Sequence, residues 1–179
     1  MQDTHFTVER HVGRVIEARV FSLRTAADVD AYAAALRTAI VHAPQPRIFI
    51  CADHRAVHIY PPEAAARLVE MFTALNPRLE NAGLLVSPTN AILVMQIERI
   101  VREAADSKRR VFTRAADWYT FLAEKMTDDE RARLRTFQHT APPPVASSPT
   151  PVPAPPPRPG SPSPTPLPAP PTRPGSQRG

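Results

Sequence analysis

The chain has 179 residues, of which 42% are hydrophobic, so a domain of ordinary size can bury a core of its own. Its formal net charge is +5, but all 17 acidic residues and every basic residue except Arg158, Arg173 and Arg178 precede residue 141. The charges of this larger part are mixed in sign, which argues against a nucleic-acid-binding surface. No apolar stretch approaches the roughly 20 residues that span a bilayer, so we expect no membrane span.

Proline divides the chain in two. Seventeen of the 23 prolines lie within residues 141–179, where the segment 148–161 recurs fifteen residues later as 163–176 with few changes. Proline fixes φ and lacks a backbone donor, so such a segment favours solvated polyproline II over a core. We therefore predict a globular domain at residues 1–140 and a disordered, proline-rich tail at residues 141–179.

The cysteine content and the first residues bear on location. Cys51 is the single cysteine, which excludes an intramolecular disulfide and suits a reducing compartment. The opening residues lack the basic region and apolar run of a signal peptide. We therefore expect a cytoplasmic protein.

The first half of the domain shows strand, helix and strand patterns. Residues 6–10 and 12–21, separated by a turn with Gly13, predict a pair of opening strands. Thr25 and Asp28 form a capping box that starts a helix to about residue 41. Its predicted inner face comprises Val29, Tyr32, Ala33, Leu36 and Ile40. The apolar run at 47–52 predicts a buried central strand.

The second half continues the alternation. Pro61 and Pro62 suit the first turn of a second helix. Its predicted inner face comprises Ala65, Leu68, Val69, Phe72 and Leu75. Residues 82–86 and 110–113 predict two further strands, separated by a third helix. The third helix has a predicted inner stripe of Leu93, Val94, Ile97, Ile100, Val101 and Ala104 and a solvated row of Gln96, Arg99, Arg102 and Glu103. We expect Met71 and Met95 to fill the edge of the core.

Two more helices complete the domain. The first covers residues 115–126, with Trp118, Phe121 and Leu122 inward, and the second follows a capping box at Thr127 and Glu130. The order ββαβαβαβα plus a terminal helix predicts an α/β domain with a mixed, mostly parallel sheet of four to five strands. The opening strands offer an edge through which a homodimer could form.

The order of the elements, and the segment 48–68 in particular, resembles the STAS domain of anti-sigma-factor antagonists and its SpoIIAA-like relatives. In that family a central strand ends in an aspartate, a loop with two apolar anchors follows, and Asp-Ser-Ser/Thr-Gly opens the next helix. Asp53 matches the aspartate, and Val57 and Ile59 match the anchors. The resemblance covers roughly residues 5–125 and implies a non-catalytic protein-recognition module.

The chain departs from the family at the phosphorylation motif. An ungapped match places Pro61, Pro62, Glu63 and Ala64 there, so no hydroxyl is present to accept a phosphate. If this register holds, Glu63 lies at or beside the serine position, at a helix N-terminus that favours negative charge. Two interpretations stay open: Glu63 is a fixed mimic of phosphate, or it is an ordinary first-turn glutamate.

The resemblance also implies where a partner would dock. The loop after the central strand, the first half of the second helix and residues 87–90 follow neighbouring strands, where open α/β sheets place their sites. We therefore predict a surface over residues 53–72 that binds another signalling protein. Its candidate residues are Asp53, His54, Arg55, His58, Tyr60, Glu63, Arg67, Thr89 and Asn90. The alternative is a small-molecule or lipid sensor of the SpoIIAA-like type. An apolar cavity beneath the second and third helices would favour this alternative.

An enzyme is a third hypothesis, in which Cys51 is a nucleophile, His54 or His58 an acid or base, and Asp53 its orienting group. Cys51 falls inside a strand expected to be buried, so we expect an inert core residue and no enzyme. His54 and His58 lie in a predicted loop rather than on one helix face, so we expect no metal site. The globular domain contains only two glycines, Gly13 and Gly83, which is too few for a glycine-rich phosphate-binding loop. We therefore expect no cofactor.

The tail carries a peptide motif twice. Pro153, Pro156 and Arg158, and again Pro168, Pro171 and Arg173, fit Pro-x-x-Pro-x-Arg. Polyproline helices of this kind bind aromatic-lined grooves such as those of Src-homology-3 domains, and a duplicated motif raises avidity. Since dense prolines also produce the motif by chance, a plain spacer is the alternative to a ligand for a proline-binding domain.

Overall fold

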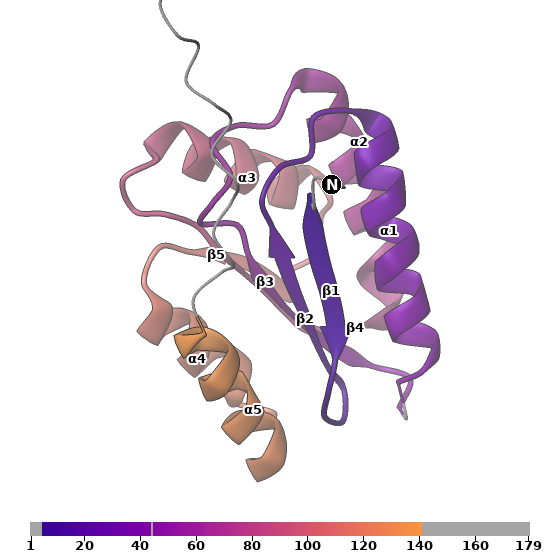
Figure 1. Ribbon diagram of the computed structural model, residues 1–179, viewed down its shortest axis with the longest axis vertical. Helices are drawn as coiled ribbons and strands as arrows, with labels where there is room; N and C mark the ends of the chain where they lie inside the picture. The colour runs from indigo at the N-terminus through magenta and orange to yellow at the C-terminus, as the bar shows by residue number, and fades with distance from the viewer. Residues whose placement is uncertain (1–4, 44, 141–179) are drawn as a thin grey trace, which may run out of the picture. The chain divides into compact units, whose positions relative to one another are not determined.

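The computed structural model describes residues 5–43 and 45–140, and this part forms one mixed sheet with five α-helices (Figure 1). The strands are β1 (Phe6–Arg10), β2 (Val15–Val20), β3 (Ile48–Asp53), β4 (Leu79–Leu85) and β5 (Arg109–Phe112). The helices are α1 (Ala26–Val41), α2 (Pro62–Leu75), α3 (Ala91–Glu103), α4 (Ala115–Ala123) and α5 (Asp128–His139), with a short 3₁₀ helix η1 (Asn76–Arg78). The predicted tail lies outside the described residues.

The strands lie side by side in chain order, from β1 at one edge to β5 at the other. β1 and β2 are antiparallel, with Phe6 opposite Val20 and Arg10 opposite Ile16. Each of the next three pairs, β2–β3, β3–β4 and β4–β5, is parallel. The predicted α/β class, the mostly parallel sheet and the antiparallel opening pair are therefore confirmed.

The central strand β3 is buried along its whole length, and its residues alternate between two cores. Ile48, Ile50 and Ala52 pack under α1, α2 and α3. Phe49 and Cys51 face the opposite side, where α4 and α5 supply Trp118, Leu122, Leu134 and Phe137. Figure 1 shows the two helix groups on the two sides of the sheet. Two apolar faces explain why β3 reads as a continuous hydrophobic run.

The predicted helix starts are present. Thr25 and Asp28 form the capping box of α1, and Thr127 and Glu130 form that of α5. The inner face predicted for α1 is buried in full. In α2, Ala65 and Val69 are only half-buried, while Ala64 and Met71 join the core. The α2 stripe is therefore rotated slightly from the predicted one, because α1 and α3 both pack against this helix.

Two buried carboxylates fasten α5 to the first hairpin. Glu130 accepts hydrogen bonds from Arg14 through the backbone N (2.9 Å), Nε (3.0 Å) and Nη2 (2.9 Å, to the second oxygen). Burial raises the pKa of Glu130, but the hydrogen bonds from Arg14 and Thr127 outweigh it and hold the pKa below its usual value. Glu17, 2% exposed, pairs with both Nε and Nη2 of Arg133 at 2.5 and 2.6 Å. Buried charges need such partners, so these pairs specify where α5 lies.

Gly83 in β4 leaves room for the indole ring of α4. A methyl group at Gly83 would lie 2.8 Å from Trp118 Cδ1 and Nε1 and 3.1 Å from Leu122 Cδ1. Trp118 is fully buried, so it has no open space into which to move. We expect Gly83→Ala to lower the free energy of unfolding by about 1–3 kcal/mol, measured by urea denaturation.

A double variant checks that the cause is this contact. Trp118→Leu removes the ring that the new methyl group meets, so its combination with Gly83→Ala should cost less than the sum of the single changes. Unchanged stability of the single Gly83→Ala variant would contradict the described packing of α4 on β4.

Candidate functional site

The loop of residues 54–60 leaves the carboxyl end of β3 and is fastened to the start of α3. The side chain of Asn90 donates to the carbonyl oxygens of His58 (2.7 Å) and Val57 (3.3 Å). The same side chain accepts from the backbone N–H of Leu93 at 3.1 Å and thereby caps α3. One asparagine therefore both starts the helix and positions the loop.

Gln96 makes the second attachment. Tyr60 N–H donates to Gln96 Oε1 at 2.9 Å, and Gln96 Nε2 donates back to Tyr60 O at 2.7 Å. The amide thus satisfies both backbone groups of Tyr60, as a neighbouring strand would. This corrects the expectation that Gln96 belongs to a solvated row.

A buried aromatic pair holds the same loop from the inside. His54 Nδ1 and Tyr60 Oη are 2.6 Å apart, and each residue is 1% exposed. Burial lowers the pKa of His54 to about 4, an effect that the nearby Asp53 carboxylate only partly offsets. Burial raises the pKa of Tyr60 well above its usual value. At neutral pH both groups are therefore uncharged, and a hydrogen bond joins the phenol to the imidazole.

Asp53 shapes the first turn of the loop. Its Oδ1 accepts from Arg55 N–H at 3.0 Å and Arg55 Nε at 2.9 Å, and its Oδ2 accepts from Arg55 Nη2 at 2.7 Å. The side-chain hydrogen bonds raise the pKa of Arg55, and burial opposes them. Asp53 is 6% exposed, and its carboxylate forms hydrogen bonds within its own loop rather than facing solvent.

Three exposed apolar side chains belong to this loop and to the first turns of α3 to which it is attached. Ile59 is 58% exposed, Ile92 68% and Met95 71%, and we name these three residues the apolar patch. Ile59 lies between the two residues whose backbones bind Asn90 and Gln96, beside the first turns of α3 that carry Ile92 and Met95. Val41, at the end of α1, is the fourth large hydrophobic side chain exposed in the described part of the chain.

The predicted contact residues divide into buried and exposed groups. Asp53, His54 and Tyr60 are buried, which corrects the expectation that they lie on a contact surface: they build the loop from within. His58, Glu63, Arg67 and Thr89 are exposed, and Arg55 and Asn90 are half-buried.

Arg67 is already engaged. Its guanidinium donates to Asp30 of α1 at 2.7 Å and to Glu70 one turn further along α2. The two carboxylates raise the pKa of Arg67 through these hydrogen bonds. Arg67 therefore joins α2 to α1, and a partner would have to compete with Asp30 and Glu70 for it.

The residues of the hypothetical catalytic set lie apart. Cys51 is buried in the core under α4 and α5, whereas His54 lines the opposite face of the sheet under α1 and α2. Burial raises the pKa of the Cys51 thiol well above its usual value, and the carboxylates of Glu17 and Glu130 add to this. His54 binds Tyr60, and Asp53 binds Arg55. These side chains form no nucleophile–base–acid chain.

A small cavity lies between α1, α2 and the sheet. Its volume is about 10 Å³, close to what one water molecule needs. Tyr32, Leu36, Phe72 and Arg109 contribute to its lining, and so does His54, whose Nε2 has no hydrogen-bond partner among the described residues. The cavity lies beneath the first and second helices, rather than beneath the second and third.

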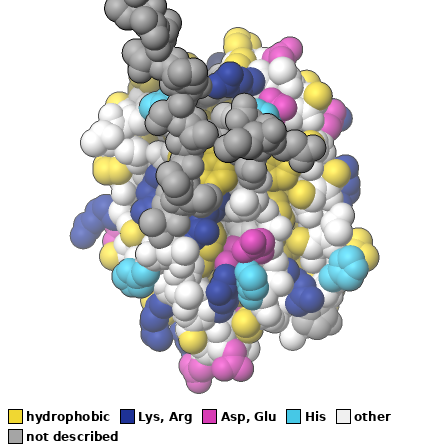
Figure 2. All heavy atoms as spheres, viewed as in Figure 1, with side chains coloured by type: hydrophobic (Ala, Val, Ile, Leu, Met, Phe, Trp, Pro, Cys, Tyr) yellow, Lys and Arg dark blue, Asp and Glu magenta, His cyan; other side chains and the backbone are white. Residues whose placement is uncertain are grey.

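The one tight basic cluster of the sequence, residues 108–110, does not form a surface patch. Arg109 is 4% exposed and donates to Asn76 Oδ1 at 2.9 Å and to Phe72 O at 3.1 Å. Burial lowers its pKa to about 10. Figure 2 likewise shows Lys and Arg, Asp and Glu, and His side chains interspersed on the face it displays.

Sequence reasoning missed the apolar patch. Ile59 was expected as an anchor and Met95 as a core-edge filler, yet both are exposed, while Val57 is 2% exposed. A signal was present in α3: Ile92 and Met95 are three residues apart and lie outside the stripe of Leu93, Ile97 and Ile100. Apolar residues beside a complete inner stripe indicate a second apolar surface.

Comparisons with known proteins find no family model that matches the chain, and no curated protein or solved structure that matches it significantly. No helix in the described residues combines the length and apolar character needed to cross a membrane. The two Pro-x-x-Pro-x-Arg motifs lie outside the described residues.

The attachment of the loop to α3 can be tested at Gln96. Replacing it by Ala leaves both backbone groups of Tyr60 without their partner, so we expect a loss of about 1–2 kcal/mol and faster hydrogen exchange at the Tyr60 amide. Arg99→Ala, which removes only an exposed pair with Glu103, is the matched control. Equal exchange at Tyr60 in the two variants would contradict the described attachment.

Proposed function

We propose that the chain is a non-catalytic protein-binding module of a cytoplasmic signalling or scaffold system, with a STAS-like domain as its recognition head. The α/β class and the mostly parallel sheet are compatible with that domain type. Asp53 at the end of the central strand, followed by a short loop and a helix, supports the resemblance. The proline-rich tail would tether the head or recruit a proline-binding domain through its two motifs.

The observation that carries this proposal is an exposed apolar patch on a fixed support. Ile59 belongs to a loop that is held by Asn90 and Gln96 outside and by the His54–Tyr60 pair inside. A preorganised surface loses little entropy on binding, and apolar side chains supply the favourable desolvation. The flanking polar side chains of His58 and Thr89, both exposed, suit a polar rim.

The start of α2 supports a module without a phosphorylation switch. Pro61 is the N-cap and Pro62 the first helical residue, and no side chain caps this helix end. Glu63 follows in the first turn and is exposed. Its negative charge interacts favourably with the helix dipole, which accounts for it without a role as a phosphate mimic.

The alternative function, a small-molecule or lipid sensor, would use the cavity beneath α1 and α2. Its lining is mostly apolar and includes three polar side chains, His54, Tyr32 and Arg109, which a ligand could engage. Its volume of about 10 Å³ is far below the several hundred Å³ typical of ligand pockets. A lipid would therefore have to push α1 or α2 away from the sheet, so partner binding is the better-supported function.

Affinity capture with charged substitutions tests the patch. We expect the full chain carrying Ile92→Glu and Met95→Glu to recover its main partner about tenfold less than the unmodified chain, because both side chains would leave a desolvated contact. Recovery is quantified by mass spectrometry. Both positions are exposed, so the fold should persist, which circular dichroism checks.

Two further variants act as controls for this capture. Val41→Glu places one glutamate, half the charge that the double variant adds, on a similarly exposed apolar residue at the other end of the parallel strands, and it should leave recovery unchanged. Arg158→Ala with Arg173→Ala identifies proteins held by the tail motifs. If the patch variant and Val41→Glu recover the same proteins equally, the patch is not the docking surface.

Glu63→Ala distinguishes the two interpretations of the helix start. A first-turn glutamate predicts a loss of stability below about 1 kcal/mol and unchanged partner recovery. A phosphate mimic predicts reduced recovery at unchanged fold. We expect the first result, with thermal unfolding and the same capture as measurements.

A further inference from the structure

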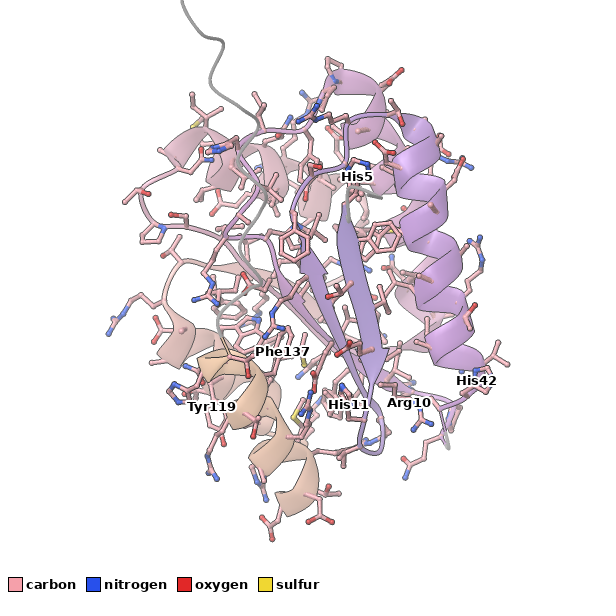
Figure 3. All side chains as sticks on the ribbon, in the orientation of Figure 1. His5, Arg10, His11, His42, Tyr119 and Phe137 are labelled. Carbon is pink, nitrogen blue, oxygen red and sulfur yellow. The ribbon has the colours of Figure 1, made fainter. Side chains whose placement is uncertain are left out.

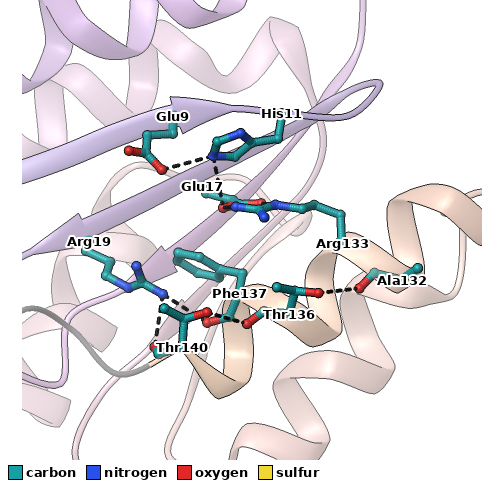
Figure 4. A network of polar contacts seen from close by, with 9 residues as sticks. All are labelled: Glu9, His11, Glu17, Arg19, Ala132, Arg133, Thr136, Phe137 and Thr140. Atoms are coloured by element: carbon teal, nitrogen blue, oxygen red, sulfur yellow. Dashed lines mark hydrogen bonds and ion pairs between the residues drawn. The ribbon is translucent and has the colours of Figure 1, made fainter.

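The first hairpin brings one imidazole and two carboxylates together on the face opposite α1. Glu9 lies directly across from Glu17 in the β1–β2 register, so both side chains project from the same face of the sheet. His11 follows β1 at the hairpin turn, and its ring reaches back over both strands (Figure 4). Sequence inspection for paired histidines missed this group, because its members are joined by strand pairing.

The distances suit a shared cation. His11 Nε2 lies 3.0 Å from Glu9 Oε2 and 4.0 Å from Glu17 Oε2, and the ligand atoms of all three residues lie within 4.8 Å of one another. Two atoms that each bind a Zn²⁺ ion at about 2.1 Å are separated by about 3.0–3.4 Å. Glu9 and His11 are 56% and 44% exposed, so these two side chains have room to adjust around an ion while the buried Glu17 stays in place.

The charges also favour a cation. Two carboxylates opposite each other on neighbouring strands repel, and Arg133 is the cation that compensates one of them. Arg133 donates to both oxygens of Glu17, and each oxygen keeps a second lone pair. Such a hydrogen bond orients a ligating carboxylate. Glu17 is 2% exposed, so this ligand is held in place before any ion arrives.

We propose that Glu9, His11 and Glu17 form a binding site for one divalent first-row transition-metal ion, with Zn²⁺ as its representative. An imidazole nitrogen beside two carboxylates selects borderline ions such as Zn²⁺ over Mg²⁺, which prefers oxygen ligands only. The bound ion joins the end of β1 to β2. Through Glu17 and Arg133 it also stabilises the contact of the hairpin with α5. The proposed metal site shares no residue with the apolar patch.

Titration of the full chain with ZnCl₂ by isothermal calorimetry tests this site. We expect saturable binding of one ion per chain, and binding of MgCl₂ should be far weaker. His11→Ala and Glu9→Gln each remove an exposed ligand, so each should weaken Zn²⁺ binding about tenfold or more without unfolding the chain.

His42→Ala is the matched control. His42 is exposed at the end of α1 (Figure 3), and its ring is hydrogen-bonded to the Thr38 carbonyl oxygen at 2.7 Å rather than to a carboxylate among the described residues. This variant should bind Zn²⁺ as the unmodified chain does. Absence of saturable binding in the unmodified chain, or equal affinity after His11→Ala, would overturn the proposal and leave a simple histidine–carboxylate pair.

Discussion

Burial of β3 on both faces is the constraint on which the rest of the structure depends. Every residue from Ile48 to Asp53 is buried, so each face of this strand needs a cover of its own. The three helices between the parallel strands all cover one face. The chain therefore continues after β5 with α4 and α5, which cover the other face.

The same alternation decides the chemistry beyond the strand. Cys51 shares one face with the core under α4 and α5, and His54 turns into the core under α1 and α2. The thiol and the imidazole lie on opposite faces of the sheet, and each group is uncharged at neutral pH because burial disfavours its charged form. Cys51 and His54 are three residues apart in the sequence, yet their side chains lie in different cores. The polar residues after β3 serve to fold a loop.

Local patterns were enough to predict most elements. The capping boxes at Thr25 and Thr127, and the inner stripe of α1, follow from spacing alone and are present.

The limits of the strands were harder to predict. β4 begins at Leu79, three residues before the predicted start. Residues 79–81 contain Glu80 and Asn81, which look like loop residues. Glu80 pairs with Lys125 beyond α4, and Asn81 donates to Phe121 O at 3.4 Å, so tertiary partners stabilise the strand there.

The position of the loop of residues 54–60 was predictable from the sequence, but not which of its side chains face solvent. Because β3 and β4 are parallel, their carboxyl ends lie at the same edge of the sheet. The loop after Asp53 begins at this edge and contacts Asn90, which follows β4. Which side chains face solvent depends on how residues 57–60 pair with Asn90 and Gln96, and no local pattern encodes that pairing. Tyr60 is buried with its hydroxyl hydrogen-bonded to the imidazole of His54. Ile59 is exposed because its neighbours on both sides are held against α3 through their backbones. In this region the buried His54–Tyr60 pair and the hydrogen bonds from Asn90 and Gln96 hold the loop, while Ile59 stays exposed beside polar side chains such as His58.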